Sequence, residues 1–302
     1  MTTVAASGTQ RHILLRALWW FHPESARSYA PATSLLLVVP LLAVLAIGFI
    51  YPIVQLVILS APGGSLENYA RAVQTPLYLD VLLSTVLVAF VVAVATLVLG
   101  YPVAYAMARL KRGAAVIVAA CVLIPLWTSI LIRSYAWIVL LQRRGIVNSL
   151  LIGSGLTERP LELLYTTGAV TLAMTHVLMP FTILPIYASL RSIPPHYLQA
   201  ARNLGAGPVR AFLNVTLPLS LPGVSAGCVL SFVLALGFYI TPALVGGPQS
   251  MLIATLIGQQ TTVLLDWPFA AALSTILLVL TLILVFLFRK TLSFSRGLNG
   301  VH

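Results

Sequence analysis

Long apolar stretches alternate with short polar connections along the chain. A transmembrane helix needs roughly 20 predominantly apolar residues, and six stretches approach or exceed that length with at most one charged residue inside each. The pattern predicts an all-α membrane protein with six transmembrane helices, because backbone polar groups in lipid must be satisfied within the segment itself. The predicted spans are Pro31–Ala61, Val81–Ala108, a third that starts near Ala114 and ends before Gln142, Leu163–Leu190, Leu217–Gly246 and Pro268–Phe288.

Two segments fit this pattern less well. Residues 249–265 are apolar but contain Gly258 and Gln259–Gln260, and they are too short to span, so we predict a re-entrant or interfacial helix. Residues 1–30 place arginines beside Trp19 and Trp20, which favours a segment on the membrane surface, with a disordered tail as the alternative for the first ten residues. The predicted division is a basic and aromatic N-terminal segment (1–30), the first transmembrane helix (31–61), the main membrane domain (78–288) and a C-terminal tail (289–302).

Composition supports the membrane assignment, and charge gives the orientation. Hydrophobic residues make up 60% of the chain, charged residues only 8%, and the mean hydropathy is +1.02. The formal net charge is +11. Because cytoplasmic loops of membrane proteins collect lysine and arginine, we predict that both termini are cytoplasmic, and we do not interpret the positive charge as nucleic-acid binding. With this orientation the cytoplasmic side holds Arg11, Arg16, Arg27, Arg109, Lys111, Arg112, Arg191, Arg202, Arg210, Arg289, Lys290 and Arg296, and the outer side holds only Arg71, Arg143, Arg144 and Arg159.

The longest polar connection, residues 195–224, has the pattern of a docking segment. Residues 197–204 form a predicted short helix that Pro194 and Pro195 open and Gly205 closes. A second short helix is predicted to start at Pro208 and to reach Leu217–Pro218, where the chain turns into a membrane span. Arginines in this connection have no acidic neighbour in sequence, so an acidic partner or anionic membrane lipid is expected.

This connection resembles the EAA loop of membrane permeases of ATP-binding cassette importers, in which the loop couples the permease to the ATPase. Gln199 stands where the family most often has glutamate, and its neutral amide removes the charge that a salt bridge to the ATPase needs. The alternative is an ordinary amphipathic cytoplasmic loop. The matching positions are Ala200, Ala201, Gly205, Leu217 and Pro218.

Two further segments are similar to spermidine/putrescine-type permeases. One is Arg133–Trp137 followed by Gly145 and Asn148, and the other combines 246–248 with 266–274. With the loop, the similarity covers about residues 65–288. It implies a type I importer transmembrane domain over 78–288, in a bacterial inner membrane.

The same resemblance implies what the subunit works with. The partners would be an ATPase dimer, a second homologous permease and a periplasmic or lipid-anchored solute-binding protein. The solute would be a polyamine such as putrescine or spermidine. An opine or an amino-acid-like solute is the alternative, since relatives in this branch carry such solutes.

The chain itself carries no recognisable catalytic motif for this work. No phosphate-binding loop is present, so ATP and magnesium are expected on the partner ATPase, and the scattered histidines offer no metal site. Gly223–Gly227 does match G-x-S-x-G, which with His176 leaves an intramembrane serine protease as an alternative of another class. In a membrane helix, however, the same small residues favour close helix packing.

Candidate solute-path residues lie near the outer ends of the spans. Arg133 either extends to the interface or pairs with an acid, with Tyr135 and Trp137 lining the path. His176 is either a hydrogen-bonded interior residue or part of a path. A second candidate group is a carboxylate with aromatic rings that would suit a cation, although a helix cap explains the carboxylate equally well. That group consists of Tyr239, Asp266 and Trp267.

Overall fold

The computed structural model describes residues 31–297, so the predicted segment 1–30 and the last residues of the tail lie outside the described chain. It divides into two units at residues 55 and 56, which we describe separately. In the first, α2 (Pro31–Leu45), a π-helical turn (Ala46–Ile50) and α3 (Tyr51–Ser60) follow one another without a break, and α3 extends five residues into the second unit. Of the side chains described in this stretch, only Ser60 is buried. The stretch therefore corresponds to the first predicted span.

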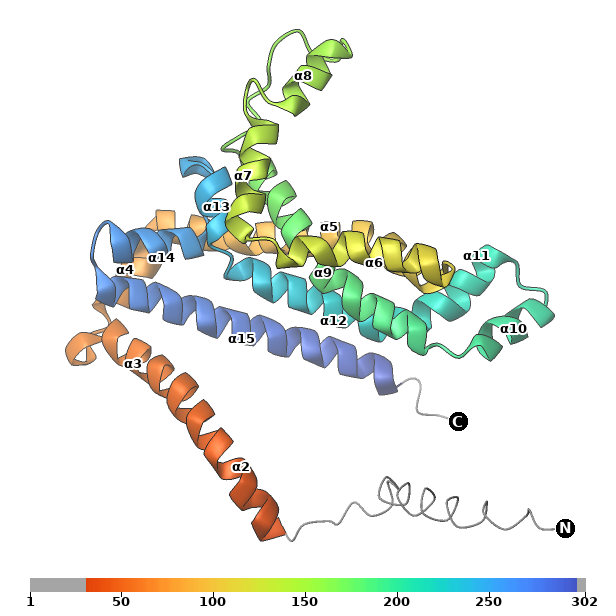
Figure 1. Cartoon of the computed structure of the whole chain (residues 1–302). Helices are drawn as coiled ribbons and strands as arrows, with labels where there is room; N and C mark the ends of the chain where they lie inside the picture. Colours follow the sequence, from red (N-terminus) through yellow and green to blue (C-terminus); the bar gives the residue numbers. More distant parts are fainter. Residues whose placement is uncertain (1–30, 298–302) are drawn as a thin grey trace, which may run out of the picture. The chain divides into compact units, whose positions relative to one another are not determined.

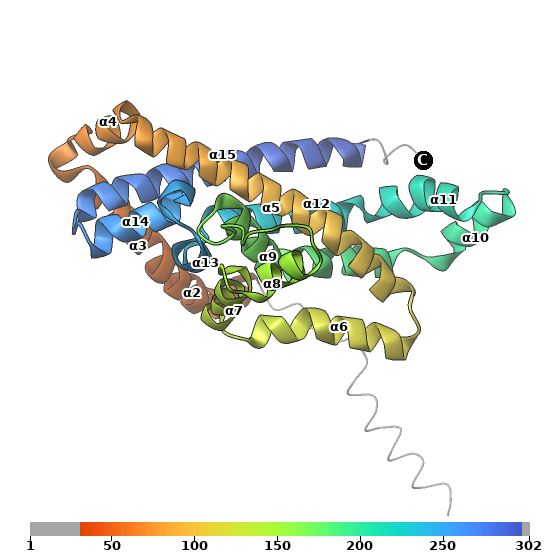
Figure 2. The ribbon, with the colours of Figure 1, turned by 90° about the horizontal axis from the view of Figure 1, so that it is seen from above.

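The second unit is built around three long helices that pack against one another: α5 (Pro76–Arg109), α9 (Thr167–Ser192) and α12 (Leu217–Leu236). A fourth long helix, α15 (Trp267–Gly297), lies along α12 (Figures 1 and 2). Thr182 Oγ1 on α9 donates to Thr96 Oγ1 on α5 at 3.0 Å and is also hydrogen-bonded to Ser231 Oγ on α12. All three hydroxyls are fully buried, so they join the three helices by polar contacts inside an apolar core.

Glycines bring α12 into direct contact with α9. A Cβ at Gly223 would lie 2.4 Å from Ser189 Cβ and 2.5 Å from the Pro185 carbonyl oxygen. A Cβ at Gly227 would lie 2.9 Å from the Thr182 carbonyl oxygen. The G-x-S-x-G match is therefore a helix-packing surface, within an element that has neither the strand nor the turn of a nucleophile elbow.

The structure does not support the protease alternative. Ser225 Oγ donates to the carbonyl oxygen of Pro222 in its own helix at 3.0 Å, while His176 accepts a hydrogen bond from Trp137. The serine and the histidine thus have other partners. No strand occurs in residues 31–297, which is consistent with the all-α prediction.

The third predicted span is not one continuous helix. It is divided into α6 (Arg112–Trp127) and α7 (Ile130–Leu141), and the chain bends by 102° at the break between them. Pro125 lies in the last turn of α6, and Thr128 and Ser129 then adopt extended ψ angles of 146° and 138°. With 16 residues, α6 is shorter than the roughly 20 that a span needs. Within residues 31–297, five continuous helices are long and apolar enough to span, and the bent pair of Arg112–Trp127 with Ile130–Gly153 makes a sixth when it is counted as one span.

Shorter helices complete the second unit. The fifth span ends at Leu236 and not near Gly246 as predicted, because residues 237–239 break the helix before α13. The predicted short helix in 249–265 is present as α14, which packs on α15 and α5. The short helices are α4 (Glu67–Gln74), α8 (Ile146–Gly153), α10 (Pro195–Asn203), α11 (Pro208–Ala211), α13 (Ile240–Val245) and α14 (Ile253–Thr262), with 3-10 turns at Pro62–Gly64 and Pro248–Ser250 and a π-helical turn at Phe212–Thr216.

Candidate functional site

The predicted docking segment has the expected helix and the expected end. α10 starts directly after Pro194 and ends before Gly205, whose φ of 80° lies in the left-handed region. Gly205 N–H donates to the Arg202 carbonyl at 2.9 Å, and Ala206 N–H donates to the Ala201 carbonyl at 3.0 Å. These two bonds form a Schellman motif, which explains why a glycine closes this helix.

α10 stands at one end of the long helices, away from their packed core (Figure 1). Among the described elements it makes its main contacts with α11 and the π-helical turn that follows. Leu204 is 89% exposed and Val209 is 67% exposed, and Gln199 and Ala200 are exposed as well. The docking segment therefore presents both apolar and small side chains at its exposed surface.

The second short helix starts at Pro208 and the membrane span starts at Leu217, both as predicted, and the two are joined without a break. α11, the π-helical turn and α12 form one continuous helical path, in which proline is tolerated at the first turn of α12. The ring of Phe212 in the π-helical turn packs edge-on against Tyr101 and Tyr105 of α5, with centroids 5.9 and 5.4 Å apart. The docking segment thus continues into α12 and contacts α5 through Phe212.

A second candidate group forms where α7 meets α9. Trp137 Nε1 lies 3.4 Å from His176 Nδ1, and the two rings meet edge-on with centroids 5.8 Å apart. Arg133 lies one turn before Trp137 on the same face of α7. The structure therefore brings together Arg133, Trp137 and His176, while Tyr135 is 58% exposed.

Arg133 has no acid partner within the described side chains, contrary to one of the two predicted alternatives. Its Nε and Nη1 atoms are buried and have no hydrogen-bond partner there. The next residue, Ser134, is hydrogen-bonded to Thr241 at 2.9 Å, which attaches α7 to α13. α7 thus holds in place a guanidinium group with two buried N–H donors that lack a partner among the described side chains.

Gly145 and Asn148, which carried part of the resemblance, have structural roles. A Cβ at Gly145 would come within 2.5 Å of the Leu140 carbonyl oxygen. The Asn148 side chain accepts from Leu161 N–H at 2.8 Å and donates to the Leu161 carbonyl at 3.0 Å. Together they fold the chain between α7 and α9 back on itself.

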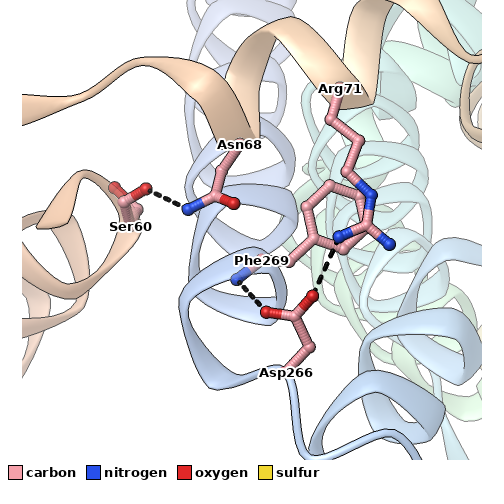
Figure 3. Close-up of polar contacts among 5 residues, drawn as sticks. All are labelled: Ser60, Asn68, Arg71, Asp266 and Phe269. Carbon is pink, nitrogen blue, oxygen red and sulfur yellow. Dashed lines mark hydrogen bonds and ion pairs between the residues drawn. The ribbon is translucent and has the colours of Figure 1, made fainter.

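Both carboxylate oxygens of Asp266 accept a hydrogen bond (Figure 3). Oδ1 accepts from Phe269 N–H at 3.2 Å, which caps α15, and Oδ2 accepts from Arg71 Nη1 at 2.9 Å. The hydrogen bond to Asp266 raises the pKa of the Arg71 guanidinium. Arg71 also lies 4.0 Å from the centroid of the Phe269 ring. This geometry gives Asp266 a structural role in attaching α4 to the start of α15.

The other two residues predicted beside Asp266 do not gather around it. Tyr239 lies against α14, where a Cβ at Gly258 would come within 2.5 Å of Tyr239 Cε2. Trp267 is 55% exposed, as suits a residue at a membrane interface. Sequence reasoning missed Arg71, although an arginine and an aspartate on the same predicted outer side were a usable signal.

We expect Asp266→Asn to leave solute uptake close to the wild-type rate. Asparagine caps a helix about as well as aspartate, and the lost ion pair is partly exposed, with 46% of the Arg71 side chain accessible. Such pairs contribute roughly 1 kcal/mol or less. The measurement is initial uptake by proteoliposomes at equal protein level, with Arg71→Gln as the matched control. A steep fall in uptake in Asp266→Asn alone would mean that the carboxylate contacts the solute.

Long helices packed around α9, a broken third span and an exposed short helix at one end define the membrane subunit of a type I ATP-binding cassette importer. Residues 100–293 match the family model described as "Binding-protein-dependent transport system inner membrane component", and the chain belongs to this family.

Relatives of known name agree with this assignment. The chain is 36% identical over 236 residues to the "Spermidine/putrescine transport system permease protein PotB" of Escherichia coli (strain K12), which covers 78% of this chain and 84% of that protein. It is 34% identical over 226 residues to the protein of the same name from Haemophilus influenzae, covering 75% and 79%. Both are permeases, as is this chain.

Solved structures share the fold. A bacterial ABC transporter involved in the import of alginate matches with a TM-score of 0.71 at 18% identity, covering 95% of this chain and 99% of that chain. The MetNI methionine ABC transporter matches with a TM-score of 0.53 at 21% identity, covering 72% and 94%.

Proposed function

We propose that this chain forms part of the translocation path of an importer for a polyamine such as putrescine or spermidine. The observation that carries the proposal is the identity of 34–36% to spermidine/putrescine permeases over about three quarters of the chain. In this proposal the path opens alternately to the two sides of the membrane, and movement of α10 changes the packing of α12 and α5. The continuous path from α11 into α12 supports that mechanical role.

The proposed partners follow from the same family membership. We assign ATP hydrolysis, with ATP and magnesium, to an ATPase dimer that docks on α10. A second homologous permease would complete the path, and a periplasmic or lipid-anchored protein would deliver the solute. One alginate transporter structure of this fold is described as a complex with an "alginate pentasaccharide-bound periplasmic protein", which supports a binding-protein partner for the fold.

The proposed orientation places the α10 end of the molecule in the cytoplasm of a bacterial cell. This end collects the basic residues Arg109, Lys111, Arg112, Arg191, Arg202 and Arg210, whereas Arg71 and Asp266 lie at the opposite end of the long helices. Because α15 runs toward the α10 end (Figure 1), the C-terminus would be cytoplasmic too.

The test is uptake by proteoliposomes that contain the chain with its own ATPase, partner permease and binding protein. ATP-dependent accumulation of labelled putrescine or spermidine is the expected result, with little competition from opines or amino acids. If neither polyamine accumulates while another solute does, the importer assignment stands and the polyamine assignment is wrong.

The unpartnered nitrogens of Arg133 favour a second candidate, a solute that carries a carboxylate. A guanidinium with free N–H donors matches a carboxylate and repels a polyamine. Opines and amino acids have such a group. Preferential uptake of these solutes that is lost in Arg133→Gln would select this candidate, and polyamine uptake that survives Arg133→Gln would reject it.

We predict that Gln199→Glu leaves the complex with the ATPase intact. Gln199 is exposed on α10, where a glutamate fits without a clash and keeps a good helix former. The measurement is the amount of ATPase that co-purifies with the permease at two salt concentrations. A large gain in the retained ATPase at low salt would instead show that the neutral amide weakens docking.

A further inference from the structure

A pocket of about 480 Å³ lies between α10 and the ends of α5 and α9. Three arginines from three different helices line it: Arg109 at the end of α5, Arg191 at the end of α9 and Arg202 on α10. A neighbouring pocket of about 270 Å³ shares Arg109 and Arg202. Arginines from three helices therefore line one hollow.

No acidic side chain in the described chain balances this positive charge, although each arginine lies in the last turn of its helix and Arg109 also lies 5.3 Å from the centroid of the Tyr105 ring. No aspartate or glutamate lines either pocket, and none of the three arginines forms an ion pair with a side chain in 38–288. The described acidic residues belong to α4, α5, the 158–162 loop and the start of α15. Like charges around one cavity repel one another, so the pocket is stabilised when an anion enters it.

The remaining lining groups suit a phosphate. The Gln199 amide and the Thr216 hydroxyl add hydrogen-bond donors, and Thr216 is only 2% exposed. Apolar residues, Leu190 and Ile193, complete the wall. The planar guanidinium group of an arginine can donate two parallel hydrogen bonds to two oxygens of one phosphate. The apolar side of the wall can accommodate the hydrocarbon part of a lipid.

We infer that this pocket binds a phosphate-bearing anion, either the headgroup of an anionic phospholipid or a free phosphate compound. The bound anion would connect α10 to the ends of α5 and α9 through the three arginines. The consequence for transport rests on the coupling role proposed for α10, whereas the binding itself does not. Because one wall of the pocket is α10, movement of this helix changes the pocket, and an occupied pocket resists that movement.

Gln199 provides a sharp test because it faces the same pocket as the arginines. Gln199→Glu places a carboxylate where the external anion would bind, while Arg191→Gln removes one cation. Arg112→Gln is the matched control, since Arg112 is exposed nearby at the same end but does not line the pocket. Both pocket variants change the charge by one unit, as does the control.

The experiment uses the complete complex in detergent and measures retention of labelled phosphatidylglycerol, supplied in mixed phosphatidylcholine vesicles, and of labelled inorganic pyrophosphate. We expect saturable binding of one probe that weakens at least fivefold in Arg191→Gln and in Gln199→Glu but not in Arg112→Gln. Retention of phosphatidylglycerol that pyrophosphate does not displace identifies a lipid headgroup, and saturable pyrophosphate binding identifies a free phosphate compound.

Equal retention in all four proteins would overturn the inference, because the probe would then bind away from the pocket. Equal weakening in all three variants would overturn it as well, because the binding would then follow net charge and not the pocket. Absence of saturable binding of both probes to the wild-type complex would overturn it too. Polyamine uptake is measured on the same preparation. If the probe binds in the pocket but no polyamine is taken up, the proposed solute is wrong and the anion site stands. If polyamine is taken up but neither probe binds, the anion site is wrong and the proposed solute stands.

Discussion

Replacing Gly223 by valine is expected to abolish uptake and to lower the amount of folded permease in the membrane. The new Cβ would fall 2.4 Å from Ser189 Cβ and 2.5 Å from the Pro185 carbonyl oxygen. Backbone atoms cannot rotate out of the way, so α12 must move away from α9. Overpacking of this kind commonly costs about 1–3 kcal/mol, and here it separates two helices of the central group. The measurements are uptake and the detergent-solubilised yield of monodisperse protein.

Two substitutions on the same helix and just beyond it serve as controls. Ser225→Ala removes only a hydrogen bond within the helix, to the Pro222 carbonyl, and Gly237→Ala places a methyl group where no atom lies within 4 Å. Both should retain uptake within about twofold. Normal yield and uptake in Gly223→Val would contradict the close packing of α12 on α9, and loss of function in Ser225→Ala would reopen the question of a catalytic serine.

The course of the chain through the membrane could be predicted from the sequence except where the helices break. Hydropathy continues unchanged from α6 into α7, so a pattern of apolar residues cannot show the 102° bend that Thr128 and Ser129 produce. The same holds for the fifth span, where apolar residues continue past the end of α12 into α13. Pro125 was the available local signal for the first of these breaks.

For the candidate sites, too, features that depend on neighbouring residues could be predicted, and features that depend on tertiary packing could not. Gly205 could be predicted because a helix C-terminus depends on neighbours within a few positions. The partner of Asp266 depends on the fold, since Arg71 lies 195 positions away in the sequence and only their shared place on the predicted outer side connects the two residues. Proximity of Trp137 to His176 likewise depends on how α7 packs on α9, and the arginine-lined pocket requires three helix ends to meet. The residue types indicated which side chains were candidates, but which residues they contact depends on the tertiary fold.

Gly205→Val is expected to uncouple ATP hydrolysis from uptake while the permease still inserts and assembles. The φ of Gly205 is 80° and no atom lies within 4 Å of a Cβ built there, so the substitution acts through the backbone alone. A left-handed conformation costs an L-residue roughly 1–2 kcal/mol, and a β-branched side chain more. The Schellman motif would open, and α10 would no longer be held at a fixed angle to α11. The measurement is the ratio of solute transported to ATP hydrolysed in proteoliposomes.

Two variants show whether backbone conformation is the cause. Gly205→Asn should keep most of the coupling, because asparagine tolerates the left-handed region. Gly207→Ala should behave as the wild type, since Gly207 has a φ of −66° and open space around its Cβ position. Coupling should therefore fall in the order glycine, asparagine, valine at position 205 and stay constant at position 207. Normal uptake per ATP in Gly205→Val would mean that α10 does not transmit the movement of the ATPase to the membrane helices.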